Sequence, residues 1–118
     1  MAETVFSLKK GLTEILVLRI LIEKEMYGYE IVKTIAERSS EVFSVTEAAL
    51  YTTLYKMEAD KLVVSREVTV GIRRRRRYYS LTEQGRAFAG EEIAKYIRMT
   101  DGIKKILSGS ETIKTKDK

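Results

Sequence analysis

The chain has 118 residues, 44% of them hydrophobic and 33% charged, a balance typical of one globular domain with a small core. It contains no Cys and no His, which excludes disulfides and thiolate sites and removes the commonest metal ligand and general base. We therefore expect no metal site, no cofactor and no enzymatic activity.

A membrane location is not expected either. The longest apolar run, Leu12–Ile22, is interrupted by Glu14 and Arg19 and is shorter than the roughly 20 apolar residues of a spanning helix. The opening segment, MAETVFSLKK, lacks the basic start, apolar core and small-residue cleavage site of a signal peptide. These features predict a cytoplasmic protein.

The positive charge of the chain is concentrated in one segment. The net charge of +5 comes from 22 basic and 17 acidic residues. Five consecutive arginines, Arg73–Arg77, account for the whole excess, because the other 17 basic residues (22 − 5) equal the 17 acidic ones in number. Such a local concentration indicates a polyanionic partner more strongly than a diffuse excess would.

The first two predicted elements are helices of a single domain, since the chain has no Pro and no linker-like stretch. Apolar residues at spacings of three and four predict a helix with a wide apolar face over about Val5–Glu25. Gly28 interrupts this pattern, and a shorter helix is expected over Tyr29–Arg38, with Ile31 and Ile35 directed inward and Val32 as a further candidate. The following SSEVFS segment is predicted to be a turn or loop.

A third helix is predicted from a capping box, formed by Ser44 and Glu47, to about residue 60. The side of this helix opposite its core stripe is small and polar, with no carboxylate beyond Glu47, so it can approach another molecule closely. The inward stripe consists of Leu50, Leu54 and Met57. The outward face consists of Ala48, Ala49, Thr52, Tyr55, Lys56 and Ala59.

A hairpin follows the third helix. The segment Leu62–Val68 alternates weakly and is rich in β-branched residues, which predicts a strand. The VTVGIR segment holds the turn, and RRRYYSL returns as the second strand. On that strand the odd-numbered arginines of the run would share one face and the even-numbered ones the other. We therefore expect two or three arginines to contact a common partner and the rest to lie in solvent or pair with acids.

A long last helix is predicted from a cap at Ser80 or Thr82 to about Leu107, with a candidate kink at Asp101 and Gly102. At 1.5 Å per residue it would be about 38 Å long, too long for a domain of this size to cover. An apolar stripe that extends beyond the globule usually packs on another copy of itself.

Three helices followed by a hairpin form the winged helix-turn-helix arrangement, in which the third helix enters the major groove and the hairpin reaches the backbone or minor groove. The predicted fold class is mainly α (α+β): a winged helix-turn-helix with a two-stranded β-wing and a long C-terminal dimerisation helix. Residues 1–81 would form the DNA-binding region, residues 82–107 the dimerisation helix of the same compact domain, and residues 108–118 a disordered tail. Three methionines are expected to fill the core, namely Met26, Met57 and Met99.

Three motifs in this order resemble the PadR family of bacterial and archaeal transcriptional regulators, over about Leu12–Leu107. The motifs are YGYE at Tyr27–Glu30, AALYTTLYKMEADKLV at Ala48–Val63 and RRYYSLTEQGR at Arg76–Arg86. The resemblance implies a homodimer that represses a promoter through a palindromic operator and is sometimes released by a small molecule.

Three departures from the family pattern affect what the resemblance implies. Ala48, Ala49 and Thr52 replace the Gly, Thr and Pro of the family's GTLYP motif, so base preference can differ. The wing carries five arginines where the family usually has one to three basic residues. The Trp that often occurs in the family's last helix is absent, and Tyr96 and Ile97 stand near its place.

We therefore expect a DNA interface, a dimer interface and an effector pocket, the last at Tyr96 and Ile97 for a small aromatic effector. Tyr51 is expected to be partly buried with its hydroxyl directed outward, and one of Tyr78 and Tyr79 to lie inward under the hairpin. The predicted DNA-binding residues are Ser44, Thr46, Glu47, Ala48, Ala49, Tyr51, Thr52, Lys56, Arg73, Arg74, Arg75, Arg76 and Arg77. The predicted dimer interface consists of Leu8, Leu12, Ile93, Tyr96, Ile97, Ile103, Ile106 and Leu107.

The most concrete hypothesis is a homodimeric, sequence-specific repressor that binds double-stranded DNA. Two alternatives remain open from the residues alone. One is a protein-interaction adaptor that recruits a different subunit through the last helix, and the other is a non-specific nucleic-acid-binding protein.

Overall fold

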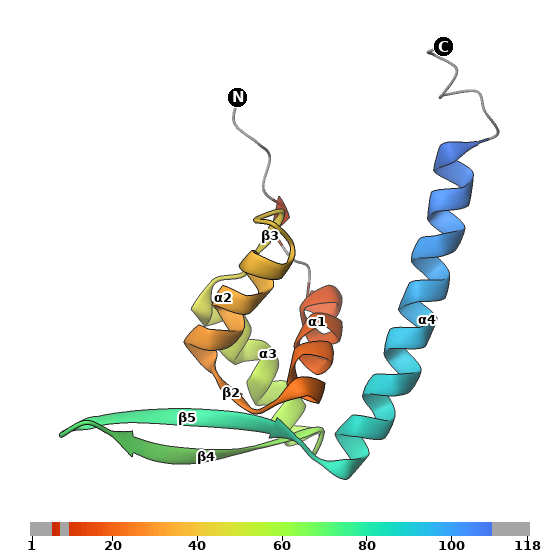
Figure 1. The fold of residues 1–118 in the computed structure, drawn as a ribbon. Helices are drawn as coiled ribbons and strands as arrows, with labels where there is room; N and C mark the ends of the chain where they lie inside the picture. Colours follow the sequence, from red (N-terminus) through yellow and green to blue (C-terminus); the bar gives the residue numbers. More distant parts are fainter. Residues whose placement is uncertain (1–5, 8–9, 110–118) are drawn as a thin grey trace.

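The computed structural model describes residues 6–7 and 10–109, and it follows the predicted order of three helices, a hairpin and a long last helix (Figure 1). The helices are α1 (Lys10–Glu23), α2 (Gly28–Arg38), α3 (Glu47–Ala59) and α4 (Glu83–Ser108). The strands are β1 (Phe6–Ser7), β2 (Met26–Tyr27), β3 (Phe43–Ser44), β4 (Val63–Val70) and β5 (Arg74–Leu81).

The predicted two-stranded wing is confirmed, and a third strand extends its base into a three-stranded sheet of order β2-β5-β4. β4 and β5 pair antiparallel along their full lengths. β2 pairs with the other edge of β5, which sets Met26 opposite Tyr79 and Tyr27 opposite Tyr78. Two residues are too few to show alternation in a sequence, so β2 was not predicted. β5 thus joins the wing to the helical body.

The predicted start of the first helix was wrong. α1 begins at Lys10, while Phe6 and Ser7 form β1 and pair in parallel with β3, residue for residue with Phe43 and Ser44. A strand of two residues carries no periodicity of its own, so the helical spacing of the later residues was extended too far toward the N-terminus.

The predicted capping box was also wrong. The cap of α3 is Thr46, whose hydroxyl accepts a hydrogen bond from the backbone N–H of Ala49 at 3.1 Å. Ser44 lies in β3, two residues before this cap, and its extended backbone belongs to the strand pairing. Both Ser44 and Thr46 are types that cap helices, and only the strand pairing decides between them.

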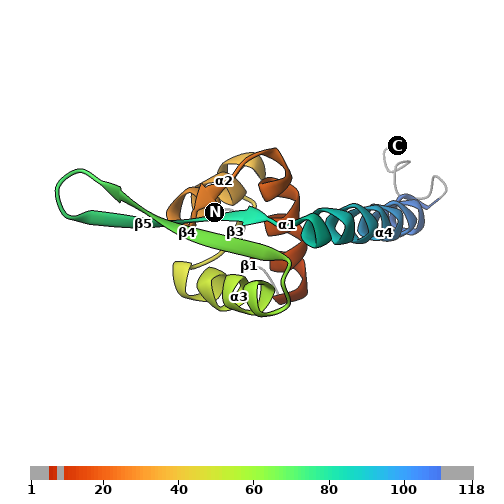
Figure 2. The same cartoon turned by 90° about the horizontal axis from the view of Figure 1, so that it is seen from below.

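The core lies between the helices and the inner face of the sheet. α1, α2 and α3 cover that face, and the hairpin runs beneath them and projects beyond them (Figures 1 and 2). Tyr79 is buried from β5, whereas Tyr78 is half-buried on the outer face, as the alternation predicted. The residues predicted to face inward from α2 and α3 are buried, except that the candidate Val32 is half-buried. The buried ones are Ile31, Ile35, Leu50, Leu54 and Met57.

α4 is fixed to the base of the wing at its first turn. Thr82 caps the helix, because its hydroxyl accepts from the Gly85 N–H at 2.8 Å and donates to the Lys61 carbonyl at 2.8 Å. The Thr82 N–H donates to the Leu62 carbonyl at 3.0 Å. Gly85 is buried directly against that carbonyl, so close that a Cβ on Gly85 would lie 2.0 Å from it. The absence of a side chain therefore permits this contact.

Beyond this junction, α4 packs on α1 and then extends past it (Figure 1). The helix is continuous through Asp101 and Gly102, where a kink was a candidate. It ends at Ser108, which was predicted to begin the tail, and Gly109 follows with a positive φ of 54°. The rest of the predicted tail lies outside the described residues.

A carboxylate on α1 holds the end of α2. Glu23 accepts hydrogen bonds from Arg38, one at 3.0 Å, and from Arg19 at 2.9 Å. The hydrogen bond with Arg38 is the main reason that the pKa of Glu23 falls from 4.5 to about 2. Because the folded-state pKa is lowered, this carboxylate stabilises the fold fully above about pH 4.5, and the contribution is lost as the pH falls toward 2.

Two glycines of α4 provide a matched test of its attachment. Gly85→Ala should lower the free energy of unfolding by about 2 kcal/mol or more, because the new methyl group would separate the helix from the Leu62 carbonyl. Gly90→Ala should raise it by about 0.5–1 kcal/mol through helix propensity, since no atom lies within 4 Å of a Cβ there. Urea unfolding at one protein concentration measures both. Equal stabilities of the two variants would contradict the junction described above.

The Glu23–Arg38 contact predicts a specific acid sensitivity. Arg38→Gln should lose less stability than the wild type between pH 4.5 and 2, because the pKa of Glu23 would be lowered less without its main partner. Thermal unfolding across this pH range makes the comparison. Lys33→Gln is the control, because it removes only an exposed ion pair with Glu37 at 4.0 Å on the same helix. The interpretation fails if Arg38→Gln follows the wild-type pH profile.

Candidate nucleic-acid interface

The outward face of α3 is exposed as predicted. All eight residues predicted to bind DNA from β3 and α3, from Ser44 to Lys56, are exposed. Besides the Thr46 hydroxyl, which caps the helix, two of their polar groups are already engaged locally. The Thr52 hydroxyl donates to the Ala48 carbonyl at 3.1 Å, and the Lys56 ammonium contacts the Asp60 carboxylate at 3.0 Å. That contact is the main reason that the pKa of Lys56 is raised, so Lys56 stays charged.

Tyr51 differs from its prediction. Its side chain is 41% exposed, which agrees with partial burial. Its hydroxyl, however, lies against Gly28, the buried first residue of α2, so that a Cβ on Gly28 would be 2.2 Å from the hydroxyl oxygen. The predicted outward direction was therefore wrong. Burial raises the pKa of Tyr51, and the phenol stays protonated at neutral pH.

One face of the wing holds two arginines on a shared carboxylate. Arg75 and Arg77 donate to the two oxygens of Glu67 at 3.1 and 2.9 Å, and Arg77 also donates to the Ser65 hydroxyl at 3.0 Å. This is the same face as the buried Tyr79, because Ser65 stands opposite Tyr79 and Glu67 opposite Arg77. The prediction that some arginines pair with acids is confirmed, although the acid was not identified from the sequence.

The outer face of the wing holds arginines on aromatic rings. The Arg76 guanidinium lies 4.2 Å from the centre of the Tyr27 ring, and that ring meets Tyr78 edge-on at 5.4 Å. Arg66 lies over the other ring of this pair, 5.6 Å from the centre of Tyr78, and is hydrogen-bonded to Glu25. The hydrogen bond from Arg66 lowers the pKa of Glu25, so this carboxylate is ionised at neutral pH.

The tip of the wing carries the arginines that remain free. Gly71 has a φ of +67° and starts the turn, and Arg73 lies in this turn, as the predicted VTVGIR turn segment implied. Within the described part of the chain, no ion pair or hydrogen bond engages the side chain of Arg73 or Arg74. Ile72 at the tip is 91% exposed, an apolar residue among basic ones that the sequence reasoning did not single out.

Two exposed features of α3 and α4 were also missed or misplaced. Tyr55 is 79% exposed in the middle of α3, but it was not among the predicted DNA-binding residues. Its spacing of three from Thr52 and seven from Ala48 was the available signal. Met99 is exposed on α4, so its predicted role in the core was wrong. The core ends earlier along α4 than the apolar pattern suggested.

Most of the predicted dimer residues lie on α4, and Leu12 lies on α1. Leu12, Ile93 and Tyr96 are half-buried, and Leu8 lies outside the described residues. The remaining four are exposed large apolar side chains, the most exposed being Ile106 at 79%. The four are Ile97, Ile103, Ile106 and Leu107. A second chain is required to test their role, so the dimer interface stays a prediction.

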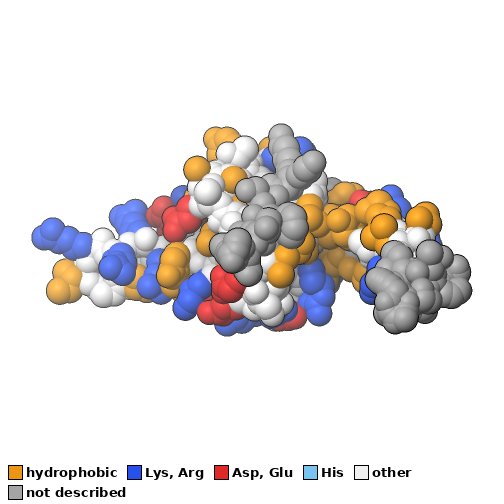
Figure 3. Space-filling model, turned by 90° about the horizontal axis from the view of Figure 1, so that it is seen from above, with side chains coloured by type: hydrophobic (Ala, Val, Ile, Leu, Met, Phe, Trp, Pro, Cys, Tyr) orange, Lys and Arg blue, Asp and Glu red, His pale blue; other side chains and the backbone are white. Residues whose placement is uncertain are grey.

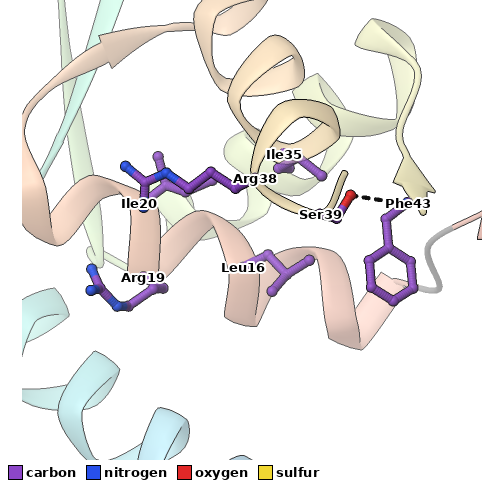
Figure 4. A pocket seen from close by; sticks show the side chains of 7 residues that line it. All are labelled: Leu16, Arg19, Ile20, Ile35, Arg38, Ser39 and Phe43. Carbon is purple, nitrogen blue, oxygen red and sulfur yellow. Dashed lines mark hydrogen bonds between the residues drawn. The ribbon is translucent and has the colours of Figure 1, made fainter. Parts of the chain in front are cut away.

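A cavity of about 240 Å³ lies between α1 and α2, and its lining is largely apolar (Figure 4). Leu16, Ile20, Ile35 and Phe43 form most of its wall, and the Ser39 hydroxyl accepts from the backbone N–H of Phe43 at 3.0 Å at one side. The predicted effector residues Tyr96 and Ile97 are not part of this lining. The effector pocket at those residues therefore stays a prediction.

The surfaces of the hairpin and of α4 differ in character. Seen from above, basic side chains surround the projecting hairpin, while hydrophobic side chains gather beside α4 (Figure 3). No helix in the described part of the chain is long and apolar enough to cross a bilayer. Over the same residues, no three Asp or Glu side chains come together as a metal site would need.

The comparisons with known proteins agree with this arrangement. The model of the Transcriptional regulator PadR-like family matches residues 17–91. A solved PadR family transcription regulator from Clostridium difficile is 31% identical, with a TM-score of 0.72, over 83% of this chain and 100% of that one. The structure of smu.1704 from Streptococcus mutans is 28% identical, with a TM-score of 0.74, over 92% of this chain and 95% of that one.

A curated but uncharacterized protein from Lysinibacillus sphaericus is 28% identical over 102 residues, which cover 86% of this chain and 94% of that protein. The match to the family model includes all three motifs, at Tyr27–Glu30, Ala48–Val63 and Arg76–Arg86. It begins within α1, at residue 17. With the winged fold and the basic hairpin, these matches establish that the chain belongs to the PadR-like family of transcriptional regulators.

Proposed function

We propose that this chain is a homodimeric repressor that binds a palindromic operator in double-stranded DNA. In this proposal α3 of each subunit enters the major groove, and the wing contacts the backbone or the minor groove. Binding to promoter DNA would place the protein in the cytoplasm.

The observation that carries the DNA contact is the position of the wing beside the exposed face of α3. The hairpin projects beyond the helices on the side at which α3 begins (Figure 2). The exposed face of α3 offers small side chains at Ala48, Ala49 and Thr52, so the helix axis can come close to the floor of a groove. The wing then lies beside the same groove with Arg73 and Arg74 unengaged.

The arginines of the wing differ in how many of their existing contacts would have to break on DNA binding. Arg75 and Arg77 must leave Glu67, although exposed ion pairs of this kind stabilise by only about 0–1 kcal/mol. Arg76 can keep its contact with Tyr27 while its outer edge meets a phosphate. Arg73 and Arg74 need no rearrangement within the described structure, so they are proposed as the first phosphate contacts.

The dimer rests on the apolar side of α4. The 26 residues of α4 span about 39 Å, and its buried residues, Gly85 and Ala89, lie in the first two turns. The second half leaves Ile103, Ile106 and Leu107 exposed, a continuous apolar surface of the kind that marks a protein–protein contact. A second copy supplies the same surface, which favours an isologous twofold interface. A flat aromatic effector would bind where Tyr96 and Ile97 of two copies meet. Measuring DNA affinity and oligomeric mass in the presence of such compounds tests for it.

Loss of the free arginines should weaken DNA binding through charge. Arg73→Ala with Arg74→Ala should lower affinity for the DNA upstream of the chain's own gene. The slope of log K against log salt should flatten by up to about 3.6 units, about 0.9 for each of the four arginines that the dimer loses. Fluorescence anisotropy at several salt concentrations measures both. Arg98→Gln with Lys105→Gln on α4 removes the same charge away from the wing and should change the slope little.

Two outcomes would count against this assignment. An unchanged affinity and slope in the Arg73 and Arg74 variant would remove the wing from the interface. If the wild type binds unrelated DNA with the same affinity, the repressor hypothesis is wrong and the chain is a non-specific nucleic-acid-binding protein.

Disruption of the α4 surface should separate the subunits. Ile103→Glu with Ile106→Glu should convert a dimer to a folded monomer and weaken operator binding, because two charges would enter the apolar contact and half-sites would no longer be bound together. Lys105→Glu, on the opposite side of α4, should leave the dimer intact. Sedimentation equilibrium gives the mass, and circular dichroism confirms that each variant is folded. A monomeric wild type at micromolar concentration would contradict the dimer and favour the adaptor function.

A further inference from the structure

Tyr55 is the one large side chain that stands on the centre line of the exposed α3 face. Positions three, four and seven residues apart share a helix face, so Tyr55 is aligned with Ala48, Thr52 and Ala59. These neighbours are short. At 79% exposure, Tyr55 therefore rises above an otherwise low surface near the middle of the helix.

Several of the other hydrogen-bonding groups on and around this face already have local partners. The Thr46 hydroxyl accepts from Ala49, and the Thr52 hydroxyl donates to Ala48. The Tyr51 hydroxyl is directed toward Gly28 rather than outward. The Lys56 ammonium is held by Asp60. Within the described residues, the Tyr55 hydroxyl has no hydrogen bond and its ring has no aromatic contact. Tyr55 thus supplies an unengaged donor and acceptor that project away from the domain.

This exposure does nothing for the fold. A tyrosine ring stabilises a protein when it is buried, and here only a small part of the ring is covered. The same ring would bury its surface if α3 entered a groove, and its hydroxyl would then lie at the level of the base edges. A neutral phenol adds no charge, so it would contribute to discrimination between sequences rather than to general attraction toward phosphates.

We propose that Tyr55 is a specificity-determining residue of the α3 face, which places its ring along the major groove and hydrogen-bonds a base edge through its hydroxyl. The inference rests on the proposed function, because it requires α3 to lie in the groove. It adds an identified contact to a face whose other central residues, Ala48, Thr52 and Ala59, can offer mainly methyl groups.

The test compares Tyr55→Phe and Tyr55→Ala with the wild-type protein on two DNA duplexes. One duplex carries the region upstream of the chain's own gene that the wild type protects, and the other has a scrambled sequence of the same length. Tyr55→Phe should weaken binding to the first duplex by roughly 3- to 10-fold, the effect of one lost hydrogen bond. Tyr55→Ala should weaken it by roughly 10- to 100-fold through the additional loss of ring contact. The affinity for the scrambled duplex should stay within about twofold of the wild-type value. The slope of log K against log salt should change by no more than a few tenths of a unit.

The control variants are Tyr29→Phe and Tyr29→Ala, because Tyr29 is also an exposed tyrosine, at 52%, but lies on α2. They should leave both affinities unchanged. Thermal unfolding of all four variants should match the wild type, which separates a binding defect from a folding defect. Selection of bound sequences from a random DNA pool should show that Tyr55→Ala loses its preference at one base pair in each half-site.

Ala48→Glu separates failure of this inference from failure of the proposed function, since a carboxylate on the same face would be repelled by DNA. If Ala48→Glu abolishes operator binding while Tyr55→Ala keeps its affinity and its sequence preference, the role of Tyr55 is wrong and the groove position of α3 stands. If Tyr55→Ala weakens both duplexes equally, Tyr55 is a backbone contact and the inference is overturned. If Ala48→Glu also binds normally, α3 does not enter the groove and the proposed function fails with it.

Discussion

The pairing of β5 with strands on both its sides is the constraint on which the rest of the structure depends. On one side it carries β4 and hence the wing, and on the other it is held by β2, which continues directly into α2. Because side chains alternate along a strand, this pairing decides which of the wing's arginines share a face with Tyr79 and which with Tyr78. The division of the basic run into two chemically different faces therefore follows from backbone geometry. One face sets two guanidinium groups on Glu67, and the other sets guanidinium groups on tyrosine rings.

The division has an electrostatic consequence for the free protein. Although five arginines are consecutive in the sequence, their charges do not act as one patch, because Glu67 offsets part of the charge on one face and Glu25 binds the neighbouring Arg66 on the other. Of the five arginines, the two whose side chains have no partner in the described part of the chain are Arg73 and Arg74, at the tip. An extended wing with its free charge at the end reaches phosphates at a distance from the helical body, where a uniformly basic surface would attract polyanions over a wider area.

Much of the fold could be predicted from the sequence because its core is periodic. Leu50, Leu54 and Met57 repeat at helical spacing, and the alternation around Tyr78 and Tyr79 placed one ring inside. What could not be predicted depended on partners far away in the chain. The short strand β2 exists only because β5 lies beside it, and Ser44 is a strand residue rather than a cap because of its pairing with Ser7.

The candidate site shows the same limit at the level of side chains. The exposed face of α3 follows from its spacing, but the direction of the Tyr51 hydroxyl depends on the missing side chain of Gly28, which belongs to another helix. The partner of Arg75 and Arg77 depends on the strand register, which a sequence pattern leaves undefined by one or two residues. Exposure at Tyr55 follows from the helical spacing, whereas the hydrogen bonds of Thr46, Thr52 and Lys56 depend on side-chain conformations that the spacing does not define.

The junction of Thr82, Gly85 and Leu62 bears on how movement could pass through the molecule. The first turn of α4 is hydrogen-bonded to and packed against Leu62, the residue that precedes β4, so α4 and the wing extend from one shared junction. In a dimer built on α4, each winged domain would be attached at one end of a helix about 39 Å long. A rotation of a few degrees between the two α4 helices would then move the winged domains by several ångströms. The distance between the two α3 helices in the dimer would thus depend on the crossing angle of the two α4 helices.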